Sequence, residues 1–222
     1  MYKALNKMRQ IILDLETTGL SKTAKITQFA AIEIIDYEPE KQLTFYLNPT
    51  IPIEPEAARI TGLTNDRLKH EPLFKEKYME ILNFIGNSPI IAHNAAFDMR
   101  VLNYELSLLA HTKLPNEIID TLIIARNKFP GERINLDALH RKYFGSAFKR
   151  KEHSAIEDCF MLLKVYQKLI GYKSQEVLDL HQKKKIISKP KDEIINTPLI
   201  TATENEIDTL KKFQKSFFDQ GS

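Results

Sequence analysis

Hydrophobic and polar positions in the first fifty residues follow the patterns of β-strands. Residues 11–15 are apolar apart from one acid, and residues 26–37 form a longer apolar run typical of a buried strand. Residues 41–48 alternate between apolar and polar side chains, which predicts a third strand. A short turn around Pro39 would join the last two strands. The chain is therefore expected to begin with an antiparallel sheet.

Beyond these strands, helical periodicity alternates with short apolar strands. The expected helices lie at about residues 56–60, 73–85, 95–110, 121–129, 135–144 and 154–172. Two brief strands, 89–92 and 118–119, lie between them, and the first is wholly apolar, as expected for a central strand. Ser154 and Glu157 form a capping-box pattern at the start of the last helix. This order predicts an α/β domain with a mixed β-sheet flanked by helices.

The composition changes after residue 172. Residues 181–191 are rich in lysine and show little periodicity, which is typical of a flexible linker. Helical spacing returns over residues 203–218, where Thr203 and Glu206 form a second capping-box pattern. The chain is therefore expected to consist of a main domain at 1–172, a linker at 173–200 and a C-terminal helical segment at 201–222.

The overall composition sets the broad class of protein. With 222 residues, 43% of them hydrophobic, the chain can form one main domain with an appendage. A net charge of +3, with both signs interspersed, permits a polyanionic partner without requiring one. The single cysteine, Cys159, excludes an internal disulfide and fits a reducing compartment. Neither a signal peptide nor a membrane-spanning stretch is recognisable, so a cytoplasmic protein without membrane partners is expected.

The first strand carries a pair of acidic residues. Asp14 and Glu16 are two positions apart, so their side chains point to the same face of the sheet. Two converging carboxylates repel each other unless a divalent cation lies between them, and Mg²⁺ prefers such oxygen ligands. For this pair alone, a half-exposed strand with a solvated polar face is the alternative.

Two further acids begin predicted helices. Asp98 follows the central strand and therefore lies at the carboxyl edge of the sheet, while Asp158 follows the cap of the last helix. Either acid could equally complement its helix dipole. His153 precedes the last helix, where a lone histidine is commonly just solvent-exposed. If all of these side chains converge, the carboxylates suit two divalent cations that assist a phosphoryl displacement, and a neutral imidazole suits the general base.

Three motifs in the chain resemble those of the DnaQ-like (DEDDh) 3′→5′ exonucleases. They are Asp14-x-Glu16-Thr17-Thr18-Gly19, His93-Asn94-Ala95-x-Phe97-Asp98 and His153-x-Ala155-x-x-Asp158. The resemblance covers about residues 9–171 and implies a ribonuclease-H-like fold. It implies that two divalent ions, Mg²⁺ or Mn²⁺, are bound by Asp14, Glu16, Asp98 and Asp158. It also implies that His153 is the general base.

The resemblance also implies a set of substrate contacts. These are Thr17, Glu56, Thr61, His93, Asn94 and Phe97. Thr17 would meet the terminal 3′-hydroxyl, and Phe97 would pack against the last sugar or base unless it is an ordinary core residue. Thr61 departs from the pattern, because proofreading members commonly carry histidine there, whereas exonuclease I-type members also carry threonine.

The C-terminal region resembles that of family members that proofread for bacterial replicative polymerases. Residues 201–222 would bind the polymerase catalytic subunit, although this segment could also pack on its own domain. Residues 175–180 resemble a sliding-clamp-binding pattern, and Lys149-Arg150-Lys151 could bind phosphates or form an ordinary solvated loop.

The leading interpretation is a proofreading exonuclease that acts on single-stranded or frayed DNA 3′ ends. One alternative is a free-standing exonuclease of the exonuclease I, exonuclease X or ribonuclease T type, trimming single-stranded DNA or RNA. The other is a non-enzymatic nucleic-acid-binding scaffold.

Overall fold

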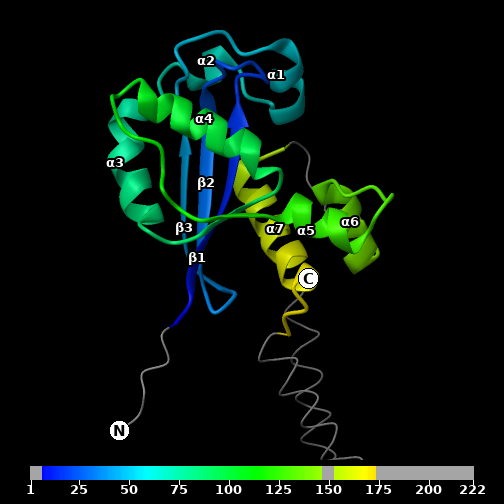
Figure 1. The fold of residues 1–222 in the computed structure, drawn as a ribbon. Helices are drawn as coiled ribbons and strands as arrows, with labels where there is room; N and C mark the ends of the chain where they lie inside the picture. Colours follow the sequence, from blue (N-terminus) through cyan, green and yellow to red (C-terminus); the bar gives the residue numbers. More distant parts are fainter. Residues whose placement is uncertain (1–6, 147–152, 174–222) are drawn as a thin grey trace, which may run out of the picture. The chain divides into compact units, whose positions relative to one another are not determined.

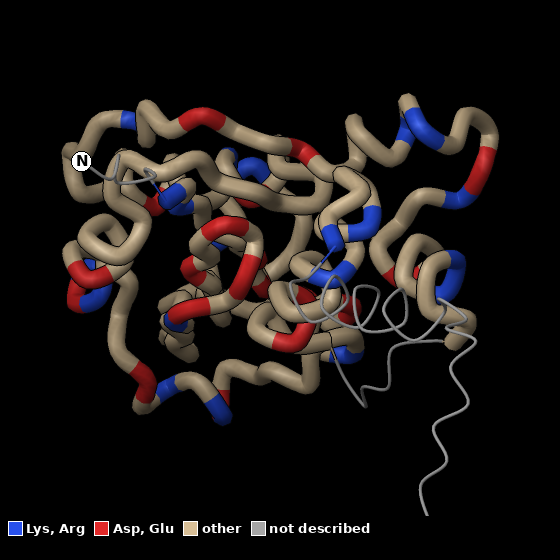
Figure 2. The backbone as a smooth tube through the Cα atoms, turned by 90° about the horizontal axis from the view of Figure 1, so that it is seen from below, with Lys and Arg blue, Asp and Glu red and all other residues tan. Residues whose placement is uncertain are grey.

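The computed structural model describes residues 7–146 and 153–173. The predicted linker beyond residue 173, the clamp-binding segment at 175–180, the C-terminal helix at 201–222 and the basic cluster at 149–151 lie outside the described residues. In the described part, a five-stranded sheet of order β3-β2-β1-β4-β5 carries helices on its two faces (Figure 1). Positions of both charge signs are spread along the backbone (Figure 2).

The sheet is mixed, as predicted. The strands β1 (Arg9–Thr17), β2 (Ile26–Ile35) and β3 (Glu38–Tyr46) pair antiparallel, whereas β4 (Ile90–Ala92) pairs parallel to β1, and β5 (Ile118–Asp120) pairs parallel to β4. β1 is the middle strand, and β4 lies between it and β5. Since parallel strands end at the same edge of a sheet, the acidic end of β1 lies beside the turn that follows β4.

The turn between β2 and β3 differs from the prediction. The chain reverses at Asp36 and Tyr37, which have φ angles of 51° and 71°, and not at Pro39. Pro39 lies within β3 opposite Ile34, next to an irregularity in the register. β3 is an edge strand, where a residue without an N–H group is tolerated. The prediction was therefore wrong because this proline does not make the turn.

Seven helices occur in the described residues. They are α1 (Pro55–Thr61), α2 (Asn65–Leu68), α3 (Phe74–Ile85), α4 (Ala95–Ser107), α5 (Thr121–Lys128), α6 (Leu136–Phe144) and α7 (Ala155–Leu169). All were predicted except α2, a single turn in which the Arg67 amide donates a hydrogen bond to the Thr64 hydroxyl. α1 ends at Gly62 with a left-handed φ of 66°, as the sequence indicated. No helix in residues 7–146 and 153–173 is long and apolar enough to cross a membrane.

Two apolar layers cover the opposite faces of the sheet. Leu13 and Leu15 of β1 pack with residues of α3 and α4. Ile12, which points the other way, packs with residues of α7. Because side chains alternate along a strand, Asp14 and Glu16 belong to the face that α7 covers.

The capping box predicted at the start of α7 is absent. Ser154 is the N-cap residue, but its side chain makes no hydrogen bond to the helix amides. Gln28 of β2 takes this role instead, since its side-chain oxygen accepts a hydrogen bond from the Ala155 amide at 3.1 Å. The Ser154 hydroxyl lies 3.4 Å from the same oxygen. The start of α7 is thereby attached to the sheet, next to His153.

A buried carboxylate on α4 gives the fold a pH-dependent stability. Glu105 is 4% exposed and accepts a hydrogen bond from the Ile26 amide at 3.3 Å. Burial raises its pKa above the ordinary value, while the Lys25 charge and the hydrogen bond from the Ile26 amide oppose that rise. A carboxyl whose pKa is raised by folding stabilises the protein below its unfolded pKa, and this contribution is lost as the pH rises through the folded pKa.

We therefore expect Glu105→Gln to unfold at higher urea than the wild type at pH 8, because the amide keeps the acceptor without the buried charge. The difference should disappear at pH 4, where the wild-type carboxyl is neutral. Urea unfolding at the two pH values measures this. A variant less stable than the wild type at pH 8 would show that attraction to Lys25 outweighs the cost of burial.

Candidate active site

The site lies where β1 runs beyond the end of β4. Ile12 pairs with Ile91, so the residues after Leu13 extend past the last residue of β4. Asp14 and Glu16 are half-buried at this end of β1. The strand thus brings its two carboxylates to the carboxyl edge of the sheet, on the face covered by α7.

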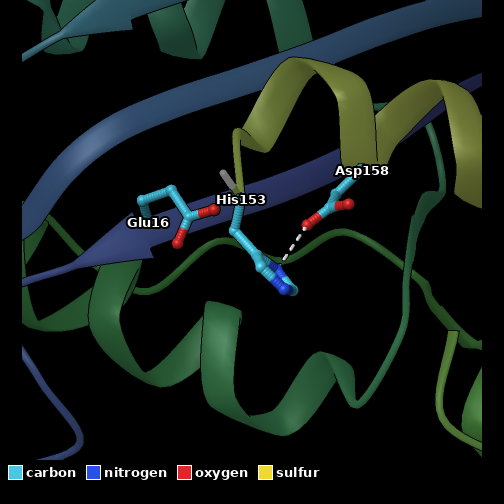
Figure 3. A group of neighbouring side chains, drawn as sticks. All are labelled: Glu16, His153 and Asp158. Atoms are coloured by element: carbon cyan, nitrogen blue, oxygen red, sulfur yellow. Dashed lines mark ion pairs between the residues drawn. The ribbon is translucent and has the colours of Figure 1, made fainter. Parts of the chain in front are cut away.

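A group of three potential metal ligands lies at this edge. Glu16, His153 and Asp158 each offer one ligand atom, and these atoms all lie within 4.8 Å of one another. Figure 3 shows their side chains converging from β1 and from the start of α7. The imidazole Nδ1 of His153 is 3.3 Å from Oδ2 of Asp158. The His153 amide also donates to the Ile60 carbonyl at 3.1 Å, which attaches this residue to α1.

Asp98 approaches the same end of β1 from α4. It is 5% exposed, and the backbone groups of Leu15 and of Asp98 itself favour the charged form of its carboxylate. Burial raises the pKa of Asp98 to about 7, with a smaller contribution from the negative charge of Asp120. Asp98 therefore lies close to the backbone of β1 at Leu15, the residue between Asp14 and Glu16.

Three carboxylates of the site act on the buried thiol of Cys159. Burial raises the pKa of this thiol well above its ordinary value, and the charges of Asp14, Asp158 and Asp98 raise it further. The thiol lies 3.5 Å from the Ala30 carbonyl of β2. Three carboxylates that act on one buried group share a small region. Glu16, His153 and Asp158 therefore form the close group at the end of β1. Asp14 and Asp98 do not belong to the group whose ligand atoms lie within 4.8 Å of one another, but their charges act in the same region.

The chemistry of this cluster fits hard divalent cations. Carboxylate oxygens are the ligands that suit Mg²⁺ and Mn²⁺. The nearly buried Asp98 has a carboxylate whose charged form is disfavoured by burial, and a bound cation stabilises that form.

A pocket of about 230 Å³ adjoins the cluster, and we call it the nucleotide pocket. Glu16 belongs to both the cluster and the pocket wall. Four predicted substrate contacts line it, namely Thr17, Glu56, Thr61 and Phe97. Leu20 and Ile60 add apolar surface. The mixture of apolar surface with a few polar groups is typical of a small-molecule site.

Hydrogen bonds fix the polar groups of the nucleotide pocket. The Thr17 hydroxyl donates to the Gly19 carbonyl at 2.8 Å, and the Thr61 hydroxyl donates to the Ala57 carbonyl at 2.9 Å. Arg59 donates two hydrogen bonds to the Glu56 carboxylate, at 2.6 and 3.0 Å. These bonds and the guanidinium charge hold the pKa of Glu56 below its usual value.

The other two predicted contacts, His93 and Asn94, do not line the nucleotide pocket. His93 Nδ1 lies 2.9 Å from the Thr121 hydroxyl, and burial lowers the pKa of this imidazole. Asn94 has a left-handed φ of 66°, and its amide donates to Asp120 at 3.0 Å. Asp120 also accepts from the Ala95 amide and caps α5. These contacts hold the turn between β4 and α4 against β5.

Sequence reasoning missed Glu54. Its carboxylate packs directly on the backbone of Gly19, in the space that a Cβ atom would fill, and its amide donates to the Thr18 carbonyl at 2.8 Å. Glu54 and Gly19 both line the nucleotide pocket. Gly19 also has a φ of 154°, which residues with a side chain rarely adopt.

We expect Gly19→Ala to lower the free energy of unfolding by about 1–3 kcal/mol through backbone strain. The same change should raise KM, because the new methyl group displaces the Glu54 carboxylate into the pocket. Urea unfolding and steady-state kinetics measure the two effects. In Gly19→Ala/Glu54→Ala, KM should recover while the stability loss persists. Wild-type stability and KM in the single variant would contradict this account.

The described geometry defines a class of enzyme. An acidic cluster with an adjacent histidine, at the end of the middle strand of a ribonuclease-H-like sheet, is the arrangement implied by the DEDDh nuclease motifs. Residues 11–166 match the RNase_T family, described as Exonuclease. The chain belongs to this DnaQ-like exonuclease family and is a 3′→5′ exonuclease, as its motifs predicted.

Individual relatives agree with this assignment. The chain is 40% identical to DNA polymerase III subunit epsilon of Rickettsia prowazekii (strain Madrid E), over 86% of this chain and 83% of that protein. The corresponding Rickettsia conorii subunit is 36% identical over 94% of this chain and 96% of its own length. The solved structure of exonuclease X in complex with 5′ overhanging duplex DNA matches 77% of this chain and 98% of its own, with 25% identity and a TM-score of 0.60. These similarities confirm the predicted fold and the resemblance to the polymerase-subunit branch.

Proposed function

We propose that this exonuclease removes nucleotides from DNA 3′ ends, with two divalent cations, as the proofreading subunit of a replicative polymerase. The observation that carries the proposal is the cluster of Glu16, His153 and Asp158, which shares Glu16 with the nucleotide pocket. A terminal nucleotide in the pocket would place its 5′ phosphate at the cluster. The relatives named as polymerase subunits support the proofreading role.

The carboxylates would act as cation ligands. Asp14, Glu16, Asp98 and Asp158 would hold two Mg²⁺ or Mn²⁺ ions, which when bound neutralise charge on the attacking and leaving oxygens. His153 takes the proton of the attacking water. With Nδ1 directed to Asp158 at 3.3 Å, the imidazole can donate its Nδ1 proton there and accept the water proton at Nε2. Asp158 therefore also orients the base.

The nucleotide pocket would hold the terminal nucleotide. Thr17 would bind the 3′-hydroxyl, and Phe97 would contact the last base or sugar. Stacking on an aromatic ring tolerates any base, because every base has a π-face. Glu56, oriented by Arg59, and Thr61 would complete the pocket wall. The remaining predicted contacts, His93 and Asn94, would act indirectly by supporting the turn that leads to Phe97 and Asp98.

The C-terminal segments would bind the partner proteins. We propose that residues 1–172 form the exonuclease domain, that 173–200 link it to the polymerase-binding segment at 201–222, and that 175–180 contact the sliding clamp. The Rickettsia conorii relative supports this organisation, because an alignment over 94% of the chain must extend into the C-terminal segment. A protein with these partners would work in the cytoplasm, where a bacterial replicative polymerase acts.

The proofreading role is tested with two 5′-labelled primer–template duplexes that differ only at the 3′ base pair. The protein should degrade the mismatched primer faster, because a frayed end reaches the nucleotide pocket more readily. It should also bind a replicative polymerase subunit, and deletion of residues 201–222 should abolish this binding without loss of exonuclease activity. A protein that degrades DNA but binds no polymerase would be the free-standing nuclease that Thr61 favours.

A further inference from the structure

A second groove, of about 500 Å³, runs along α4 beside the nucleotide pocket. The charged residues among its described lining are Lys22, Arg100 and Lys113, all of them basic. Tyr104 and Met99 also contribute to the lining. We call this feature the basic groove. A groove that combines cations with an aromatic side chain is typical of surfaces that bind single-stranded nucleic acid.

Arg100 connects the basic groove to the nucleotide pocket. Its guanidinium carbon lies 5.0 Å from the centre of the Phe97 ring. The same group donates to the carbonyls of Ser21, at 2.7 Å, and Leu20, at 3.4 Å. Phe97 and Leu20 line the nucleotide pocket. Arg100 therefore forms a wall shared by the two sites, and a chain leaving the pocket on this side enters the groove.

The segments that carry the two lysines are fixed to α4. Lys22 follows Ser21, whose carbonyl is bound by Arg100. Lys113 precedes Leu114, whose amide donates to the side chain of Asn103 on α4 at 2.9 Å. Both lysine side chains are exposed. The groove thus presents cations from two loops that are held in place on one helix.

The chemistry proposed for the site indicates which part of a substrate would lie there. In a phosphoryl displacement the attacking and leaving oxygens are in line, on opposite sides of the phosphorus. His153, the proposed base, belongs to the α7 side of the sheet, whereas α4 packs on the other side. Attack from the α7 side directs the leaving 3′-oxygen, with the strand that it ends, toward α4.

We infer that the basic groove binds the substrate strand on the 5′ side of the scissile phosphate, with Lys22 and Lys113 contacting its phosphates. This inference rests on the proposed function. The pocket on the α7 side of the site is a weaker candidate, because Glu157 lines it together with Arg67. In the basic groove, cations meet phosphates and the Tyr104 ring offers a surface for a base.

The test compares two substrates of one enzyme. The p-nitrophenyl ester of thymidine 5′-monophosphate fills the nucleotide pocket but has no strand beyond the scissile bond. A long single-stranded DNA oligonucleotide does have a strand beyond the scissile bond. For Lys22→Gln/Lys113→Gln, we expect KM for the oligonucleotide to rise about tenfold at low salt, and the slope of log KM against log salt concentration to fall by about 1.4 for two lost contacts. Hydrolysis of the ester should stay at the wild-type rate.

Lys164→Gln is the matched control, since it removes one exposed lysine from α7 and should change neither substrate's kinetics. An unchanged oligonucleotide KM and salt slope in the double variant would overturn the inference, while ester hydrolysis by the same protein would uphold the catalytic site. An equal loss on both substrates would also overturn it, because the lysines would then act at the reacting phosphate. Wild-type protein that cleaves neither substrate would instead refute the proposed function.

Discussion

Replacing Asp158 with asparagine should lower kcat by about three orders of magnitude or more, the expected result of losing several kcal/mol of transition-state stabilisation. The change keeps the size of this buried side chain but removes a carboxylate from the cluster with Glu16 and His153. It also weakens the interaction that orients the His153 imidazole, now 3.3 Å away. Rates on a 5′-labelled oligonucleotide, with urea unfolding in parallel, measure the effect.

Glu157→Gln is the control for this variant. Glu157 and Asp158 both lie in the first turn of α7, but Glu157 is exposed. If the role of Asp158 were only to complement the helix dipole, the two changes would lower stability by similar small amounts and leave kcat alone. That outcome would contradict a catalytic assignment for Asp158.

His153→Gln should lower kcat by about 10²- to 10⁴-fold, the usual contribution of a general base, while KM changes little. Glutamine can still form hydrogen bonds but cannot accept the water proton at neutral pH. Steady-state kinetics measure the split between kcat and KM. In His153→Gly, added imidazole should restore part of the activity, which a purely structural role for the side chain would not permit.

His111→Gln serves as the matched control for His153. His111 is exposed and contacts the Tyr78 ring at a tilt of 59°, with ring centres 5.0 Å apart, outside the active-site cluster. Its replacement should leave kcat unchanged. A His153→Gln variant with wild-type kcat and a raised KM would assign this histidine to substrate binding and not to proton transfer.

Local patterns predicted the acidic part of the site because strand alternation alone fixes the relation between Asp14 and Glu16. The helix that begins near Asp98 was likewise visible from its apolar spacing. What brings these elements together is the parallel pairing of β1 with β4, between residues far apart in the chain. The convergence of these side chains was predicted from the motifs, because their resemblance to a family implied it and residue spacing alone could not establish it.

One local expectation failed because a distant residue competed for the same group, and two tertiary features gave no sequence signal. The side chain of Gln28, on β2, replaced the Ser154 capping box at the start of α7. Similarly, the contact of Glu54 with Gly19 joins two loops that have no common sequence pattern. The basic groove was also hidden, since Lys22 and Lys113 approach α4 from separate segments. Such contacts depend on tertiary packing and leave no periodic signal.

The most direct test of the central claim is degradation of a 5′-labelled single-stranded DNA oligonucleotide in the presence of Mg²⁺, by the wild type and His153→Ala side by side. The account predicts a ladder of products shortened from the 3′ end with the wild type, and an intact oligonucleotide with the variant. A folded wild-type protein that yields no ladder with Mg²⁺ or Mn²⁺, or an equal ladder from His153→Ala, would contradict it.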